Sequence, residues 1–182
     1  TVTERVNPTG CHLFLQLWHC GRASHSDFHN GELPVSASAV KLDGDQIHTP
    51  LGKKDYEVPR PLTFSDIKAT VNDFRTAALN AKKAGFSGVE VHSANGYLLN
   101  QFLALRTNRR TDDWGGDFAN RMRLPVEVVR RVREAVGPDF IVVYRLSMID
   151  LVPDGQTWDE VVRLAKAVEA AGATILNTGI GW

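Results

Sequence analysis

Three side chains that could do chemistry stand close together in the middle of the sequence: His92, Asn95 and Tyr97. A neutral imidazole has one donor and one acceptor nitrogen, a side-chain amide has two N–H donors, and a phenol can give up a proton. Together they suit a carbonyl or nitro oxygen that gains negative charge during a reaction, with Tyr97 protonating a neighbouring atom. The three side chains could therefore form a site that stabilises an oxyanion and supplies a proton.

A short apolar strand, predicted at residues 89–91, comes directly before these side chains. Ligand sites in parallel α/β sheets and barrels lie just past the carboxyl ends of the strands, so this position supports a functional reading. A structural reading stays open beside it, because polar residues are ordinary chemistry for a strand-to-helix turn. In that reading His92 and Asn95 cap the next helix and Tyr97 packs in a core.

The segment around these residues closely resembles a known signature. Residues 92–102 (HSANGYLLNQF) and 107–116 (TNRRTDDWGG) resemble the motif of the old yellow enzyme family of FMN-dependent ene reductases. The resemblance implies that His92 and Asn95 hold the activating oxygen of the substrate and that Tyr97 delivers a proton to the alkene. It also implies FMN as cofactor, NAD(P)H as reductant, and an activated alkene as substrate.

A second candidate segment, residues 11–19 (CHLFLQLWH), alternates in the way typical of a buried strand and contains the polar Gln16. A buried amide without a partner costs about 1 to 3 kcal/mol, so Gln16 needs either a structural partner or a polar ligand. Trp18 on such a strand is commonly plain core. Residues 15–22 (LQLWHCGR) resemble an old yellow enzyme strand, which implies that Gln16 contacts the flavin pyrimidine ring and that Trp18 lines the substrate cavity.

Arg145 interrupts the third candidate segment, an apolar strand predicted at residues 140–147 (FIVVYRLS). A buried guanidinium needs an anion or an electron-rich ligand. A salt bridge to Asp150 or Glu90 would meet that need. The family resemblance implies instead that Arg145 faces the N1 and O2 edge of the flavin and steadies the negative charge of the reduced ring.

The remaining pattern predicts an alternation of helices and strands. Capping boxes open helices at Thr63 and Thr157, and an amphipathic pattern predicts a third helix at 120–136. A fourth strand is predicted at 173–177. Four strands separated by three helices indicate right-handed parallel βαβ units.

The expected fold class is α/β, a partial (β/α)₈ TIM barrel, because a complete one needs about 250 residues and this chain has 182. Matching to the family implies about strands 3 to 6 with their helices, without the last two strands that cradle the FMN phosphate. We expect one incomplete domain over 1–182. We also expect a long loop excursion over 23–61, in which residues 49–54 (TPLGKK) resemble a family hairpin.

The composition of the chain limits which binding partners are expected. Lys plus Arg and Asp plus Glu are both 21, so no nucleic-acid partner is expected. Cys11 and Cys20 form no ligand motif and suit a reduced, cytoplasmic protein, and no apolar run predicts a membrane span. No metal site is expected, because the loop histidines (His25, His29 and His48) lack completing ligands. Arg106, Arg109 and Arg110 are expected to pair with the neighbouring Asp112 and Asp113 rather than bind phosphate.

Three functions remain open. The chain opens on Thr1 and resembles an excerpt of a longer barrel, so one alternative is a non-catalytic half barrel that needs a partner chain, either a second copy or a complementing fragment. Residues 105–108, 144–148 and 179–182 are more similar to bacterial 2,4-dienoyl-CoA reductases, which makes an enoyl thioester the alternative substrate. The main expectation is an ene reductase.

Overall fold

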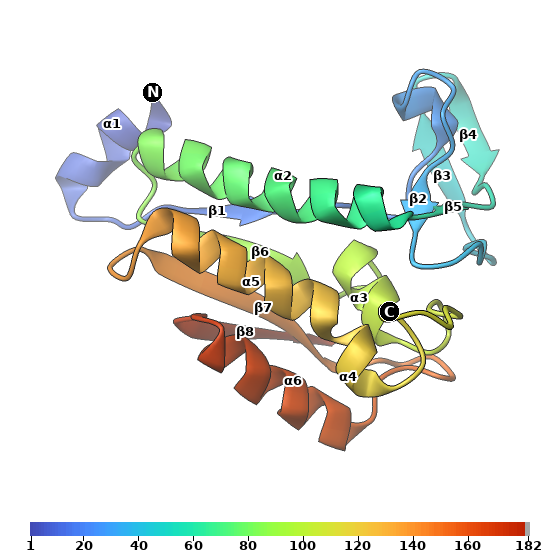
Figure 1. Cartoon of the computed structure of the whole chain (residues 1–182). Helices are drawn as coiled ribbons and strands as arrows, with labels where there is room; N and C mark the ends of the chain where they lie inside the picture. The colour runs from blue at the N-terminus through green and yellow to red at the C-terminus, as the bar shows by residue number, and fades with distance from the viewer. Residues whose placement is uncertain (181–182) are drawn as a thin grey trace.

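The computed structural model describes residues 1–180 and contains a four-stranded parallel sheet in the order β1-β6-β7-β8 (Figure 1). The strands are β1 (Phe14–Leu17), β6 (Gly88–Ser93), β7 (Ile141–Ile149) and β8 (Ile175–Ile180). Three long helices, α2 (Phe64–Lys83), α5 (Arg123–Val136) and α6 (Trp158–Ala170), connect them and cover one face. The predicted alternation of parallel strands and crossover helices is confirmed.

Local sequence signals explain where the helices begin. Thr63 accepts a hydrogen bond from the Asp66 N–H in a full capping box, and Thr157 does the same with Glu160, as predicted. The prediction of one continuous helix over 120–136 is wrong, because α4 (Phe118–Arg121) and α5 are separate helices. Pro125 has no N–H to donate to the preceding turn, so it suits the first turn of α5 and not the interior of a longer helix.

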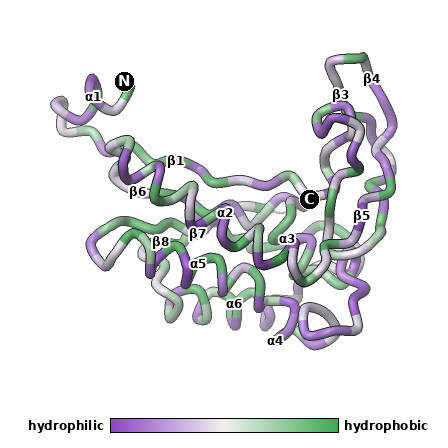
Figure 2. The backbone as a smooth tube through the Cα atoms, turned by 45° about the horizontal axis from the view of Figure 1, so that its top comes forward, coloured by the Kyte–Doolittle hydropathy of each residue, from purple (hydrophilic) through white to green (hydrophobic). Residues whose placement is uncertain are grey.

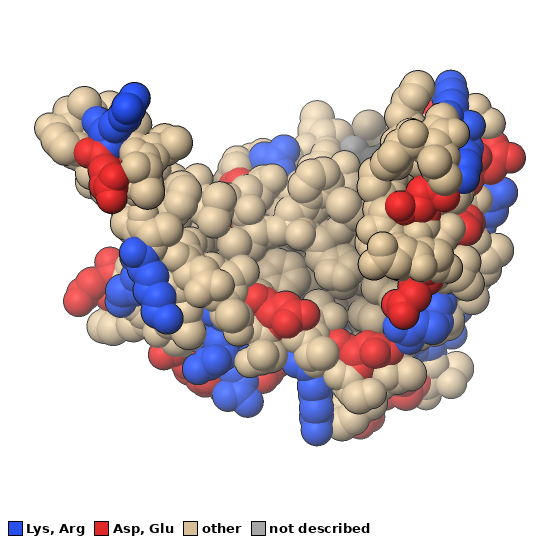
Figure 3. All heavy atoms as spheres, turned by 90° about the horizontal axis from the view of Figure 1, so that it is seen from above, with Lys and Arg blue, Asp and Glu red and all other residues tan. Residues whose placement is uncertain are grey.

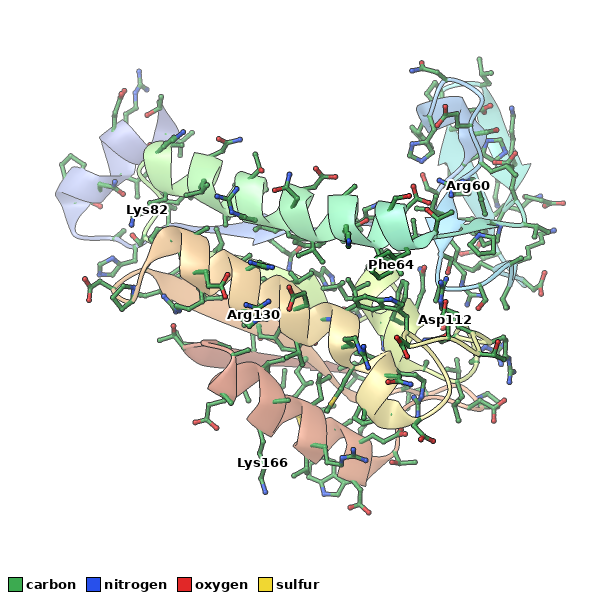
Figure 4. All side chains as sticks on the ribbon, in the orientation of Figure 1. Arg60, Phe64, Lys82, Asp112, Arg130 and Lys166 are labelled. Atoms are coloured by element: carbon green, nitrogen blue, oxygen red, sulfur yellow. The ribbon has the colours of Figure 1, made fainter. Side chains whose placement is uncertain are left out.

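The core lies between the sheet and the three covering helices. Val89, Val91, Val142 and Tyr144 are fully buried on the helix-facing side of β6 and β7. Figure 2 shows hydrophobic segments concentrated in the strands and their covering helices, whereas the stretch around β3 and β4 is largely hydrophilic. Charged side chains on the covering helices, such as Lys166 of α6, point away from the sheet (Figure 4). The three long helices leave the opposite face of the sheet uncovered within residues 1–180 (Figure 1).

The prediction that the first strand is buried is wrong. Phe14 and Leu15 are 41% and 38% exposed, and Gln16 is exposed as well. The reason is topological, because β1 and β8 are the two edges of the sheet and have a neighbouring strand on one side only. Ile175 of β8 is exposed for the same reason.

The excursion over 23–61 stands beyond the carboxyl ends of the strands (Figure 1). It contains the 3-10 turn η2 (Ser26–Phe28), the strands β2 (Val35–Ser36) and β5 (Arg60–Pro61), and an antiparallel hairpin of β3 (Gln46–Thr49) and β4 (Gly52–Asp55). The hairpin around residues 49–54 is confirmed. Seen from above, the surface is hollowed between the N-terminal segment and this excursion, and Lys and Arg lie around the hollow rather than on its floor (Figure 3).

Three short elements outside the excursion were given no residue range by the sequence prediction. They are α1 (Val2–Val6), η1 (Asn7–Thr9) and α3 (Leu98–Leu103). The first two close the amino end of the sheet, where Thr3 and Asn7 donate to the carbonyl oxygens of Ala84 and Gly85. Helix α3 has six residues, all of them buried, and it follows the turn that carries Asn95.

Candidate functional site

The uncovered face of the sheet gathers the candidate side chains in neighbouring register positions. Gln16 of β1 lies opposite Glu90 of β6, and His92 of β6 lies opposite Arg145 of β7. Arg145 in turn lies opposite Asn177 of β8. Because side chains two residues apart in a strand share a face, these five residues line the same side of the sheet.

The turn after β6 has a backbone that most residues avoid. Asn95 has a φ of 59° and Gly96 a φ of 73°, both in the left-handed region that Asn and Gly adopt most easily. The Gly96 N–H donates to Oδ1 of Asn100, 2.9 Å away. The N-cap of α3 is Tyr97, and no side-chain hydrogen bond caps that helix. The alternative that His92 and Asn95 serve as helix caps is therefore wrong.

His92 is buried and has its ring proton fixed by the backbone. Its Nδ1 accepts a hydrogen bond from the N–H of Ala94 at 3.3 Å, so the neutral ring carries its proton on Nε2 and can donate from there. Burial lowers the pKa of His92, and the nearby positive charge of Arg145 lowers it further, against a smaller opposing effect of Glu90. The imidazole is thus held as a neutral donor.

Trp18, His92 and Tyr97 form an aromatic cluster at the carboxyl edge of the sheet. The rings of Trp18 and His92 stack with centroids 6.0 Å apart, and the Tyr97 ring meets both edge-on at 4.7 and 5.2 Å. Trp18 is 52% exposed, so the alternative that it is plain core is wrong. It also lines a cavity of about 690 Å³ between the end of β1 and the excursion, together with Ser24 and His29.

Arg145 reaches the turn that carries Asn95. Its Nε lies 3.5 Å from Oδ1 of Asn95, and no carboxylate forms an ion pair with it within residues 1–180. The expected salt-bridge partners are engaged elsewhere, since Asp150 accepts hydrogen bonds from Ser147 and Gln156. A Cβ at Gly179 would lie only 3.1 Å from Nη2 of Arg145, so the glycine leaves room for the guanidinium.

Glu90 is a functional candidate that the sequence analysis considered only as a partner of Arg145. One of its oxygens accepts from Nε2 of Gln16 at 2.7 Å, and the other accepts from Nδ2 of Asn177 at 2.6 Å. The predicted salt bridge to Arg145 is absent from the described residues, and the carboxylate bridges two amides instead. A carboxylate flanked by the valines of an apolar strand was the available signal.

Gln101 of α3 joins three segments around the site and was also missed. Its Nε2 donates to the carbonyl oxygens of Cys20 and Gly96, and its Oε1 accepts from the Arg22 N–H and the Ser36 hydroxyl. The side chain is completely buried. It therefore fixes the Asn95 turn relative to the end of β1 and to the excursion.

The loop beyond α3 is held by internal pairing, as predicted for Arg110 but not for Arg109, which pairs with Asp154 at 3.5 Å instead. Arg110 makes a two-pronged contact with Asp112, at 3.0 and 2.6 Å, and donates to the carbonyl oxygens of Ala37 and Leu62. Figure 4 shows Asp112 and Phe64 close to the start of α2, where this loop meets the helix. The loop is thus part of the scaffold at the carboxyl edge.

Two further observations on residues 1–180 concern metal binding and membrane-spanning helices. No group of three or more His, Cys, Asp or Glu side chains is arranged to hold a metal ion in this part of the chain. None of the helices described there is both long and apolar enough to cross a membrane. The last two residues of the 179–182 segment, Gly181 and Trp182, lie outside the described residues.

Comparison with known proteins gives a consistent relationship. Residues 1–182 match the model of the NADH:flavin oxidoreductase / NADH oxidase family. The chain is 39% identical over 180 residues to an NADH oxidase from Thermoanaerobacter brockii, covering 99% of this chain and 26% of that protein.

Solved structures resemble the chain in the same way. An old yellow enzyme homologue from Zymomonas mobilis superposes with a TM-score of 0.89 and 36% identity, covering 97% of this chain and 50% of that one. A 2-naphthoyl-CoA reductase in complex with 2-naphthoyl-CoA superposes with a TM-score of 0.82 and 31% identity, covering all of this chain and 28% of that one. The chain thus spans half or less of the length of these proteins.

Proposed function

Because this chain belongs to the NADH:flavin oxidoreductase / NADH oxidase family, we propose that it forms the catalytic half of an FMN-dependent barrel. The proposed reaction is the reduction of activated C=C bonds in α,β-unsaturated compounds, with NAD(P)H as reductant. The observation that carries this proposal is the convergence of Arg145, Asn95 and His92 at one edge of the sheet, with Tyr97 in contact with His92. These residues belong to two strands and one turn that the chain brings together only on folding.

The side chains on the uncovered face fit the polar edge of an isoalloxazine ring. Arg145 offers a guanidinium that has no carboxylate partner among residues 1–180, which suits an electron-rich ligand edge. The amides of Gln16 and Asn177 add neutral hydrogen-bonding groups in the same row. In this proposal Gln16 and Arg145 hold the ring, and the FMN phosphate is bound by strands that are not part of this sequence.

The bound flavin supplies hydride transfer from reduced nicotinamide to the β-carbon of the alkene. The protein's own residues handle the charge and the proton. His92 donates from Nε2 to the activating oxygen of the substrate, and Asn95 donates from its amide, so that both stabilise negative charge as it develops. Tyr97 gives its phenol proton to the α-carbon.

The aromatic cluster and the excursion shape the rest of the site. Trp18 stacks against His92 and lines the cavity beside it. A cavity of about 690 Å³ is large enough for a small organic molecule. We therefore place the substrate between Trp18, Tyr97 and the excursion.

The test uses the full-length protein, purified and loaded with FMN. Under anaerobic conditions, NADH or NADPH should bleach the flavin absorbance, and a cyclic enone should restore it with formation of the saturated ketone. A protein that binds FMN and is reduced by nicotinamide, yet does not pass electrons to any activated alkene, would contradict the proposal.

A second candidate function is reduction of an unsaturated CoA thioester. Structural similarity to a 2-naphthoyl-CoA reductase favours this candidate. The polar set could serve a thioester carbonyl as well as a ketone, because both gain negative charge on oxygen. Comparing kcat/KM for a cyclic enone with that for a 2,4-dienoyl-CoA separates the two, and a preference of more than tenfold for the thioester would replace the first proposal.

The third candidate is a half barrel that acts only in assembly with another chain. The exposed Phe14 and Leu15 of β1 and Ile175 of β8 support a need for further strands at both sheet edges. The 182-residue chain alone should then be colourless and should form an oligomer by light scattering. A yellow monomer would exclude this candidate.

Two free thiols, Cys11 and Cys20, support a reducing, cytoplasmic setting.

A further inference from the structure

Glu90 occupies the centre of a polar row that crosses the uncovered face of the sheet. It lies between Gln16 of β1 and Asn177 of β8, with hydrogen bonds of 2.7 and 2.6 Å to their amide nitrogens. Register places Gln16 directly opposite Glu90, whereas Asn177 belongs to a strand two positions away in the sheet. The carboxylate therefore joins residues from three of the four strands.

The chemistry of a carboxylate dictates how the two amides are turned. An ionised carboxylate only accepts hydrogen bonds, so each amide must present its NH₂ group to Glu90. The carbonyl-type oxygens, Oε1 of Gln16 and Oδ1 of Asn177, are then the polar atoms left for another partner. Neither oxygen accepts a hydrogen bond within residues 1–180. Without Glu90, either amide could rotate by half a turn and offer its donors instead.

We propose that Glu90 is a positioning residue. It holds the Gln16 and Asn177 amides so that their oxygens face the flavin ring, and the site therefore selects a ligand edge that carries an N–H donor. This rests on the proposed function, and it adds a residue to it. The imide edge of a flavin has one such donor, N3–H, between two carbonyl groups. Arg145, next to this row, supplies the complementary donors for carbonyl oxygen.

The carboxylate acts through the amides and touches no reacting atom, so its effect belongs to cofactor binding and not to the proton transfer. Glu90→Gln has nearly the same shape but can donate as well as accept, so it no longer dictates the orientation of the two amides. Because the two amides can then turn either group toward the ligand, we expect FMN to bind about tenfold more weakly to this variant.

The experiment measures the dissociation constants of FMN and of 3-methyl-FMN with the full-length apoprotein, by quenching of flavin fluorescence. The wild type should discriminate strongly against 3-methyl-FMN, because methylation removes the N3–H donor. Glu90→Gln should bind FMN more weakly and discriminate less. Glu90→Asp, which keeps the charge but shortens the side chain by one methylene, should lie between the two and serves if Glu90→Gln does not fold.

Glu134→Gln is the matched control, since it neutralises a solvent-facing carboxylate on α5 that pairs with Arg130 and Arg131. It should leave both dissociation constants unchanged. If Glu90→Gln binds FMN as the wild type does and keeps the full discrimination, the positioning role is overturned while the proposed function stands. If the wild type itself binds no flavin, the proposed function and this inference fail together.

Discussion

Arg145 and Asn95 are joined across the carboxyl edge of the sheet, with Nε of the guanidinium 3.5 Å from the amide oxygen of Asn95. Asn95 also donates from Nδ2 to the carbonyl oxygen of Ile180 at 3.2 Å. The turn after β6 is therefore tied to both β7 and β8. As a result, the residue proposed to steady the flavin and the residue proposed to hold the substrate oxygen form one connected unit.

Replacement of Tyr97 by Phe tests the proton donor. The ring contacts with Trp18 and His92 should survive, because only the hydroxyl is lost. General acid catalysis contributes about 10²- to 10⁴-fold, so we expect the alkene-reduction step to slow by about 10²-fold or more. Stopped-flow absorbance measures this step separately from flavin reduction by NAD(P)H, which should be unchanged. Wild-type alkene reduction in Tyr97→Phe would remove Tyr97 from its proposed role.

Two replacements of Asn95 separate the effect of its backbone conformation from the effect of its side-chain amide. Asn95→Gly and Asn95→Ala both lose the side-chain amide, but only Gly adopts a φ of 59° without strain. A left-handed conformation costs an L-residue roughly 1 to 2 kcal/mol, so Asn95→Ala should be less stable than Asn95→Gly by about 1 kcal/mol in urea denaturation. Both should raise the KM for the alkene.

The corresponding pair at Asn30, which has a φ of 54° in the excursion, is the control. Asn30→Ala should likewise be less stable than Asn30→Gly, since the same backbone argument applies there. Neither Asn30 variant should change the KM. An equal KM for wild type and Asn95→Gly would show that the amide does not hold the substrate.

Gln101→Leu tests the buried link between the turn and its surroundings. The leucine would leave two carbonyl oxygens, one N–H and one hydroxyl without their partner in a completely buried position. Since each unpaired buried group costs about 1 to 3 kcal/mol, we expect the free energy of unfolding to fall by about 3 kcal/mol or more. Chemical denaturation measures this change, and a loss below about 1 kcal/mol would contradict the assigned role.

A pH series tests the two histidines whose pKa is lowered, the half-buried His19 and the buried His92. The pKa of His19 and that of His92 are both lowered from 6.5, chiefly by burial. The unfolded chain therefore binds protons at a higher pH than the folded one, so the free energy of unfolding should fall as the pH drops below about 6.5. Urea denaturation between pH 7.5 and pH 5 measures the slope, and His92→Asn should reduce it.

Protonation of carboxylates affects stability in a separate, lower pH range. Hydrogen bonds from Arg60 and Thr63 lower the pKa of Asp66 from 3.8 to about 2, so its contribution to stability is lost only as the pH falls below 3.8 towards 2. The histidine prediction would be contradicted if the free energy of unfolding fell only below pH 4 and stayed constant between pH 6.5 and pH 5.

Much of the fold could be predicted because the local sequence signals are strong. The capping boxes at Thr63 and Thr157 mark helix starts through hydrogen bonds between residues three positions apart, which depend on no distant part of the chain. The apolar runs of β6 and β7 indicated the strands of parallel βαβ units. The boundary at Met122 was missed, although Pro125 was a usable signal.

The sequence by itself determined the types of residue at the site and the order of strands and helices, because periodicity and motif spacing are local properties. Only the tertiary structure decided that Glu90 binds Gln16 and Asn177 rather than Arg145. It also decided that Gln101 joins Gly96 to Cys20, residues 76 positions apart in the chain. Such partners follow from strand register and helix docking, which bring distant residues within hydrogen-bonding distance and leave no trace in local spacing.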